Sequence, residues 1–166
     1  MTREAPPIVA ILGRPNVGKS TLFNRYAGHR RALVEDTPGV TRDRIAEAVE
    51  VEGRRVLVVD TAGLDPEPKE GGLEAAVQAQ ARAAMEGADA LLLVVDGKAG
   101  LLPQEEALAR ELRRSRKPLL VAVNKIDHPA HAERVAEFYA LGLEPLRALS
   151  AEHGSGAWDA LEELVA

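Results

Sequence analysis

Residues 13–20 read Gly13-Arg14-Pro15-Asn16-Val17-Gly18-Lys19-Ser20, the G-x-x-x-x-G-K-S pattern of a phosphate-binding loop. An apolar run at 8–12 precedes this stretch, and a helical pattern starts near Lys19. A buried strand before the loop and a helix after it are the context that gives the motif its meaning. The stretch predicts a nucleotide-binding P-loop. The alternative is a glycine-rich turn whose lysine is merely solvated.

Each part of the loop suits a phosphate chain. Glycines at 13 and 18 let the backbone turn tightly and approach a phosphate closely. Successive N–H groups form an anion nest, which the positive end of the following helix reinforces. Lys19 adds a charge for the β and γ phosphates, and the Ser20 hydroxyl can bind Mg²⁺. The predicted nucleotide contacts here are Gly13, Arg14, Pro15, Asn16, Val17, Gly18, Lys19, Ser20 and Thr21.

Length and composition narrow the class of protein. A chain of 166 residues that is 46% hydrophobic is long enough for one domain with a substantial core. It has no cysteine, which excludes disulfides and Cys-ligated zinc. Apolar runs stay short of the roughly 18 residues of a membrane span, and the first residues lack a signal-peptide core. We therefore expect a cytoplasmic monomer without membrane contact. The net charge of −5 argues against nucleic-acid binding by this domain alone.

Strand-like apolar runs alternate with helical patterns along the chain, which is typical of βαβ units. The pattern predicts strands at 8–12, 46–52, 55–59, 90–95, 119–123 and 145–149, and helices at 19–27, 73–85, 104–114, 132–141 and 156–165. Gly53 separates two strand-like runs as in a hairpin, so the strand at 46–52 should be antiparallel and near an edge. Trp158 lies at helical spacing with Leu161 and is assigned to the core. The prediction is one α/β domain, residues 1–166, with a mostly parallel six-stranded sheet, one antiparallel edge strand and helices on both faces.

Loops that follow parallel strands gather at one edge of the sheet, so polar residues at strand ends are site candidates. Asp60 ends the apolar run at 55–59 and is placed to hold Mg²⁺ through a water. The alternative role for Asp60 is that of a turn former. Gly63 follows closely and lets a backbone N–H approach a γ phosphate.

Asn124, Lys125 and Asp127 end another buried strand. The Asp127 carboxylate can accept two hydrogen bonds from guanine, at N1–H and the 2-amino group. Adenine offers neither donor, so it would leave a charge unpaired. Asn124 can either bond the base N7 or tie the loops together, and the Lys125 stem can lie along the base.

Two further loops complete the predicted site. Ser150, Ala151 and Glu152 follow the last strand, where a backbone N–H could meet the guanine O6. A threonine in the loop at 36–43 can join Mg²⁺ only when a γ phosphate is present, which would make the loop a switch. Thr37 and Thr41 cannot be told apart from local sequence.

These motifs occur in the order of the five G motifs of Ras-like GTPases, over nearly the whole chain. The variant Gly-Arg-Pro-Asn-Val-Gly-Lys-Ser-Thr-Leu-Phe-Asn, with Asp-Thr-Pro-Gly-Val-Thr-Arg-Asp, resembles the bacterial ribosome-assembly GTPases EngA, also called Der, of the TrmE-Era-EngA group. The position near the N-terminus resembles the first of their two G domains. The resemblance implies a Ras-like G domain that binds GTP and GDP, uses Mg²⁺ held by Ser20, Thr41 and Asp60, and meets the ribosome or its precursor through the full-length protein. It also favours Thr41 over Thr37.

The sequence departs from the Ras pattern after Asp-x-x-Gly. Leu64 stands where Ras-like proteins carry the glutamine that orients the attacking water. In several relatives K⁺, held partly by the residue that matches Asn16, supplies positive charge in the transition state, and the hypothesis is that Asn16 does so here. Length differs too, because EngA has a second G domain and a KH-like domain, so the chain resembles an excised domain. Asp-Thr-Ala-Gly also replaces the Asp-Thr-Gly-Gly more usual in the first domain.

The sequence therefore predicts a GTPase with a low intrinsic rate that acts as a molecular switch, with Lys19, Asn16, Thr41 and Gly63 taking part in catalysis. Two alternatives remain within GTP binding: a nucleotide-gated binding module with negligible hydrolysis, and an Era-like or TrmE-like GTPase acting in another RNA process. A phosphotransferase for adenine nucleotides is a third alternative, against which the residues Asn124 to Asp127 argue.

Overall fold

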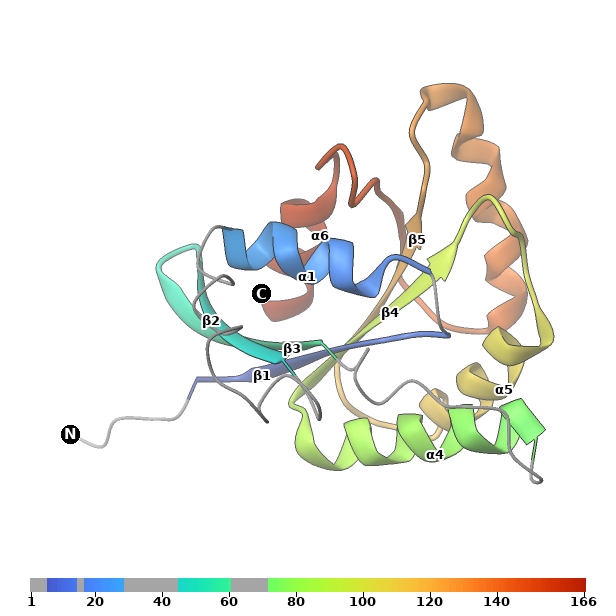
Figure 1. Ribbon diagram of the computed structural model, residues 1–166, viewed down its shortest axis with the longest axis horizontal. Helices are drawn as coiled ribbons and strands as arrows, with labels where there is room; N and C mark the ends of the chain where they lie inside the picture. The colour runs from blue at the N-terminus through green and yellow to red at the C-terminus, as the bar shows by residue number, and fades with distance from the viewer. Residues whose placement is uncertain (1–5, 15–16, 29–44, 61–71) are drawn as a thin grey trace.

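The computed structural model describes residues 6–14, 17–28, 45–60 and 72–166. The elements are β1 (Ile8–Leu12), α1 (Lys19–Ala27), β2 (Ile45–Val51), β3 (Arg54–Asp60), α4 (Gly72–Gly87), β4 (Ala90–Asp96), α5 (Pro103–Leu112), β5 (Leu119–Asn124), η3 (Pro129–Leu141), β6 (Leu146–Ala148) and α6 (Ala157–Val165). The strands form one mixed sheet, and the helices cover both of its faces (Figure 1).

The six strands lie in the order β2-β3-β1-β4-β5-β6. β1 pairs in parallel with β3 and β4, and the parallel pairing continues through β5 to β6. β2 pairs antiparallel with β3 through the hairpin at Gly53 and lies at the edge. The predicted α/β class, strand number and antiparallel edge strand are confirmed.

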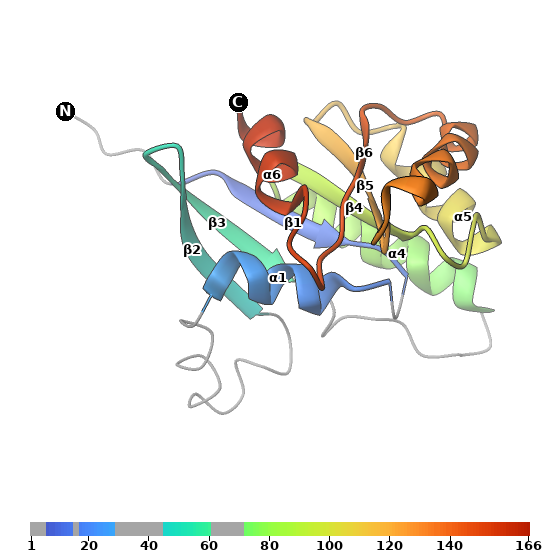
Figure 2. The same ribbon diagram turned by 90° about the horizontal axis from the view of Figure 1, so that it is seen from above.

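Alternation along the buried strands divides the core in two, because successive side chains of a strand point to opposite faces. On β4, Leu92 and Val94 join the core that contains side chains of α1 and α6. Leu91 and Leu93 join the second core, with side chains of α4, α5 and η3. Figure 2 shows the sheet from above, with α1 and α4 on its opposite faces. Burial on both faces explains why β4 and β5 read as unbroken apolar runs.

Two details differ from the sequence prediction. The helix expected at 132–141 is a 3₁₀ helix that starts earlier, at Pro129. Proline is favoured in a first helical turn, and the His128 ring nitrogen Nδ1 caps the turn by accepting a hydrogen bond from the Ala130 N–H at 3.0 Å.

Trp158 is the second difference, because it is 37% exposed rather than in the core. The buried side of α6 consists of Ala157, Ala160, Leu161 and Leu164, the i, i+3, i+4, i+7 positions of one helical face. Trp158 lies one residue off that face and packs edge-on against Tyr26, with ring centroids 5.2 Å apart. No helix in the described part of the chain combines the length and apolar character that a bilayer crossing requires.

Candidate guanine nucleotide site

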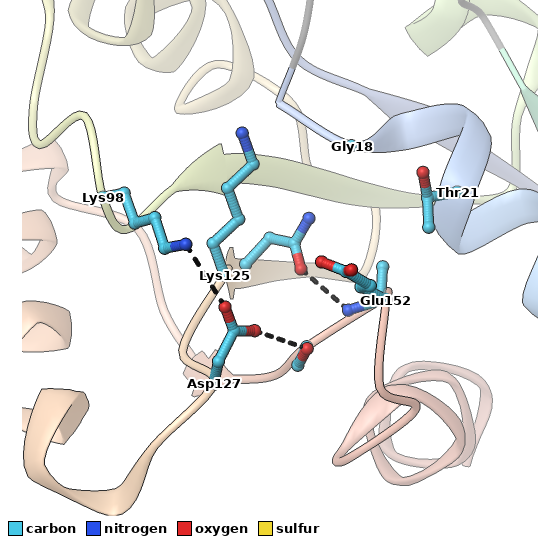
Figure 3. Close-up of a pocket in the computed structure, with 9 residues that line it drawn as sticks. Gly18, Thr21, Lys98, Lys125, Asp127 and Glu152 are labelled. Atoms are coloured by element: carbon cyan, nitrogen blue, oxygen red, sulfur yellow. Dashed lines mark hydrogen bonds and ion pairs between the residues drawn. The ribbon is translucent and has the colours of Figure 1, made fainter.

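Among the described residues, the predicted site residues at the start of α1, the end of β5 and the loop after β6 lie together at the carboxyl edge of the parallel strands. Gly18, Asn124 and the loop after β6 border one pocket of about 260 Å³. Its lining consists of Gly18, Thr21, Lys98, Asn124, Lys125, Asp127, Ser150, Ala151 and Glu152. Figure 3 shows these side chains around the opening. All of them except Lys98 belong to the predicted nucleotide contacts.

The described part of the phosphate loop is stabilised by a hydrogen bond between two of its own residues, Lys19 and Gly13. Lys19 is only 3% exposed, and its Nζ donates a hydrogen bond to the Gly13 carbonyl at 2.8 Å. A buried ammonium is costly unless it is paired, so this bond fixes the lysine close to the loop backbone. The arrangement keeps the charge of Lys19 at the phosphate loop, beside the Gly13 carbonyl.

Ser20 and Asp60 come together from α1 and the end of β3. The Ser20 hydroxyl donates a hydrogen bond to Asp60 Oδ2 at 3.0 Å, and Asp60 is 1% exposed. A hydroxyl and a carboxylate are oxygen ligands of the kind that Mg²⁺ prefers. These two residues therefore fit a magnesium site, in which the Asp60 carboxylate accepts a hydrogen bond from the Ser20 hydroxyl.

Asn124 joins two loops of the site. Its Nδ2 donates to the Val17 carbonyl at 2.9 Å, and its Oδ1 accepts from the Ala151 N–H at 2.9 Å. Of the two roles left open by the sequence, the structure shows the tie between loops. Because the side chain is 3% exposed, both bonds are shielded from water.

Asp127 presents its carboxylate to the pocket with three neighbours. The Ser150 hydroxyl donates to Oδ1 at 2.7 Å, Lys98 Nζ lies 3.4 Å from Oδ2, and His153 Nε2 lies 3.9 Å from Oδ1. The Ser150 hydrogen bond, with the nearby Lys98 ammonium, holds the pKa of Asp127 below its ordinary value. The carboxylate is thus kept in the ionised form that an N1–H and an amino group require.

The loop after β6 is supported from outside by α1. Arg25 donates from Nε to the Ala151 carbonyl and from Nη2 to the Glu152 carbonyl, both at 2.7 Å. Its planar guanidinium holds two successive peptide groups at once through donors fixed in one plane, whereas a lysine ammonium lacks that fixed fork. Arg25 therefore fixes the loop that was predicted to meet the guanine O6.

Sequence reasoning missed four residues that contact site residues: Arg25, which holds the loop after β6; Lys98, beside Asp127; Asp96, which pairs with Lys125 at 2.8 Å; and Glu105, which pairs with Arg14 at 2.7 Å. One of them had a readable signal, because Asp96 ends the apolar strand β4 as Asp60 ends β3. The other three are brought to the site by loop and helix geometry. Four residues with predicted roles, Pro15, Asn16, Thr41 and Gly63, lie outside the described residues, and their roles stay predictions.

The family model of the 50S ribosome-binding GTPases matches residues 8–125. The chain is 50% identical over 162 residues to GTPase Der of Heliobacterium modesticaldum, covering 98% of this chain and 37% of that protein. It is 53% identical over 160 residues to GTPase Der of Solidesulfovibrio magneticus, covering 96% and 36%. The chain thus spans little more than a third of these relatives.

Solved structures agree with this similarity. Era from Aquifex aeolicus bound to GDP and AlF4⁻ has a TM-score of 0.72 at 28% identity, over 98% of this chain and 55% of that one. The G domain of the T. maritima FeoB transporter has a TM-score of 0.67 at 26% identity, over 97% and 98%. The family model, the sequence relatives and the solved structures all indicate a GTPase G domain. The chain belongs to the family of 50S ribosome-binding GTPases.

Proposed function

We propose that this domain binds guanine nucleotides and slowly hydrolyses GTP to GDP and phosphate as a molecular switch. The observation that carries the proposal is the pocket itself, in which Asp127, Asn124 and the loop after β6 border the start of α1. A carboxylate there selects guanine over adenine, and the phosphate loop lies next to it. The family of 50S ribosome-binding GTPases supports the same activity.

The hydrolysis is in-line attack of water on the γ phosphate, which relies mainly on positioning and charge neutralisation. Lys19 and the N–H groups of the loop stabilise the charge that develops on the phosphate oxygens. Ser20 and Asp60, with Thr41, would hold Mg²⁺, which neutralises charge on the β and γ phosphates when bound. The N–H at Gly63 would approach the γ phosphate. No side chain of the described residues is assigned as a general base.

The guanine assignment is tested with Asp127→Asn. The amide would donate where the carboxylate accepts, so GDP affinity should fall at least about tenfold. Affinity for XDP should rise, because xanthine carries a carbonyl oxygen in place of the 2-amino group. Isothermal titration with GDP, XDP and ADP measures both changes, and Asp159→Asn on α6 is the surface control. An Asp127→Asn protein that keeps full GDP affinity would contradict the assignment.

The catalytic part of the proposal concerns Asn16 and K⁺. We expect phosphate release from GTP with Mg²⁺ to be faster in K⁺ than in Na⁺ at equal ionic strength. Asn16→Ala should remove that difference while GDP still binds. A K⁺ dependence that survives in Asn16→Ala would argue against this role. Absence of turnover in both salts, with GDP binding intact, would leave only a binding module.

For the biological setting we propose assembly of the large ribosomal subunit. Support comes from the family description and from the similarity to GTPase Der. Contact with the ribosome or its precursor would be made through the full-length protein. A cytoplasmic location, a monomeric state, the lack of nucleic-acid binding by this domain alone, and its origin as one domain of a longer chain stay predictions.

A further inference from the structure

Next to the guanine pocket, and including its lining residue Lys125, lies a group of four charged side chains that we call the strand-end cluster: Arg14, Asp96, Glu105 and Lys125. Arg14 follows β1, Asp96 ends β4, Lys125 follows β5, and Glu105 lies in the first turn of α5. Lys125 Nζ donates to Asp96 Oδ2 at 2.8 Å. Arg14 Nε lies 2.7 Å from Glu105 Oε2. The cluster thus joins the phosphate loop to the loop at 124–127, which we call the base-binding loop.

Both carboxylates of the cluster are buried, with Asp96 6% and Glu105 1% exposed. Buried charges need close partners, and the cluster supplies them in two pairs. Arg14 Nη2 is 3.9 Å from Asp96 Oδ2, well beyond its distance to Glu105. The closest cation to Asp96 Oδ2 in these pairs is thus Lys125 Nζ at 2.8 Å, with Arg14 Nη2 the more distant one.

The other oxygen of Asp96 shapes the turn that follows β4. Oδ1 accepts from the N–H groups of Lys98 at 2.8 Å and Ala99 at 3.1 Å. Burial opposes ionisation of Asp96, but the Lys125 bond and these two N–H groups outweigh it and lower its pKa. The turn is pressed against the base-binding loop, because a Cβ added at Gly97 would lie 2.8 Å from the Asn124 carbonyl oxygen. Asp96 therefore contacts the loop at 124–127 in two ways: directly through Lys125, and through the turn after β4 that packs against this loop.

Lys125 has two neighbouring carboxylates, one in space and one in the sequence. One is Asp96, and the other is Asp127, only two residues along the chain. Figure 3 shows the Lys125 side chain extending away from Asp127, whereas Lys98 points toward it. Lys125 is in the left-handed region at φ 67°, which sets the direction in which its stem leaves the loop. An ammonium released from Asp96 could compete with guanine for Asp127.

We propose that Asp96 is a positioning residue of the guanine pocket: its carboxylate holds the Lys125 stem along the pocket wall and keeps the Lys125 ammonium from pairing with Asp127. This inference rests on the proposed function, since the ligand it concerns is a guanine nucleotide. The two residues should then behave as one unit in binding.

The test is a double-mutant cycle between Asp96→Asn and Lys125→Met, read out as the Kd for GDP. Asparagine keeps one oxygen for the turn N–H groups and places an NH₂ against Lys125, so it removes one interaction. Methionine keeps an apolar stem without the charge. We expect Asp96→Asn to weaken GDP binding about tenfold in the wild-type chain and less than twofold beside Lys125→Met, as for residues that act together.

Glu111→Gln is the matched control, because Glu111 is also a buried carboxylate paired with an arginine, Arg82, at 2.9 Å. It should change the urea midpoint without changing the Kd for GDP. If Asp96→Asn does not fold, Asp96→Ser replaces it, since its hydroxyl can also accept from the turn.

Three results would overturn the inference. The Kd for GDP could be unchanged in folded Asp96→Asn. The loss could be equally large with and without Lys125, which would mean that Asp96 acts only through its turn. The third is a wild-type chain that binds no GDP, which overturns the proposed function and this inference with it.

Discussion

Gly18 combines two constraints in a single residue at the start of α1. Its φ of 104° lies in the left-handed region, and an added Cβ would lie 2.2 Å from Asn124 Nδ2. Asn124 cannot move aside easily, because its two hydrogen bonds hold the Val17 carbonyl and the Ala151 N–H. The glycine is therefore required by space as well as by backbone conformation.

This predicts unequal costs for two alanine substitutions. Gly53 in the β2–β3 hairpin also has a positive φ, 81°, but an added Cβ meets nothing within 4 Å. Gly53→Ala should destabilise the fold by about 1–2 kcal/mol through backbone strain. Gly18→Ala should lower the free energy of unfolding by about 1–3 kcal/mol more than Gly53→Ala, because displacing Asn124 leaves the Val17 carbonyl and the Ala151 N–H unpaired. Urea unfolding compares the two, and equal costs would show that Asn124 yields without loss.

At the scale of elements, α1 supports the site at both of its ends. Its first turn carries Lys19 and Ser20, and Arg25 near its last turn holds two carbonyls of the loop after β6. Phosphate binding and base binding are therefore fixed to the same helix. A change in Arg25 should reach the base through the loop, without touching the phosphate loop.

We expect Arg25→Ala to weaken GDP binding several-fold, since the loop loses two hydrogen bonds on its outer side. Arg25→Lys should lie between Ala and the wild type, because an ammonium lacks the planar fork that holds both carbonyls. Isothermal titration with GDP measures the series, with Arg110→Ala on the exposed side of α5 as control. The same GDP affinity in Arg25→Ala and Arg110→Ala would show that the loop keeps its shape unaided.

For the whole molecule, the strand-end cluster affects how stability varies with pH. The pKa of Asp96 is lowered on folding, so its stabilisation is present above the ordinary aspartate value of about 3.9 and lost as pH falls through the folded pKa. The pKa of Glu105 is raised by burial, so its contribution is present below its ordinary value and lost as pH rises through the folded pKa. The two act in opposite directions.

Asp96→Asn should isolate the first of these contributions. Between about pH 5 and pH 3, the variant should lose less unfolding free energy than the wild-type chain, because position 96 no longer takes up a proton. Urea unfolding at a series of pH values measures this. Parallel curves for the two proteins would mean that Asp96 gains no stabilisation from its ionised form.

Most of the fold could be read from the sequence, because its signals are local. The apolar runs that became β4 and β5, and Gly53 between two strand patterns, specify a parallel sheet with an edge hairpin. Trp158 was misplaced because helical spacing alone does not say where the buried face of a helix ends.

The site could be predicted from the sequence where its residues lie at strand ends or in motifs, as with Asp60 and Asp127. It could not be predicted where a contact depends on tertiary geometry. Arg25 meets the Ala151 carbonyl across 126 positions of sequence, and no local pattern encodes that approach. Lys98 likewise reaches Asp127 only because β4 and β5 are neighbours in the sheet.

The contact between Tyr26 and Trp158 gives the chain an optical probe of its own. Trp158 is the only tryptophan, and its ring lies 5.2 Å from that of Tyr26. Tyr26 is on α1, and its hydroxyl donates to the Ala157 carbonyl of α6 at 2.7 Å. We therefore expect efficient resonance energy transfer from Tyr26 to Trp158 in the folded chain, and this contribution should fall when α1 and α6 separate. Intrinsic fluorescence therefore reports the packing of the helix that carries the phosphate loop, without any added label.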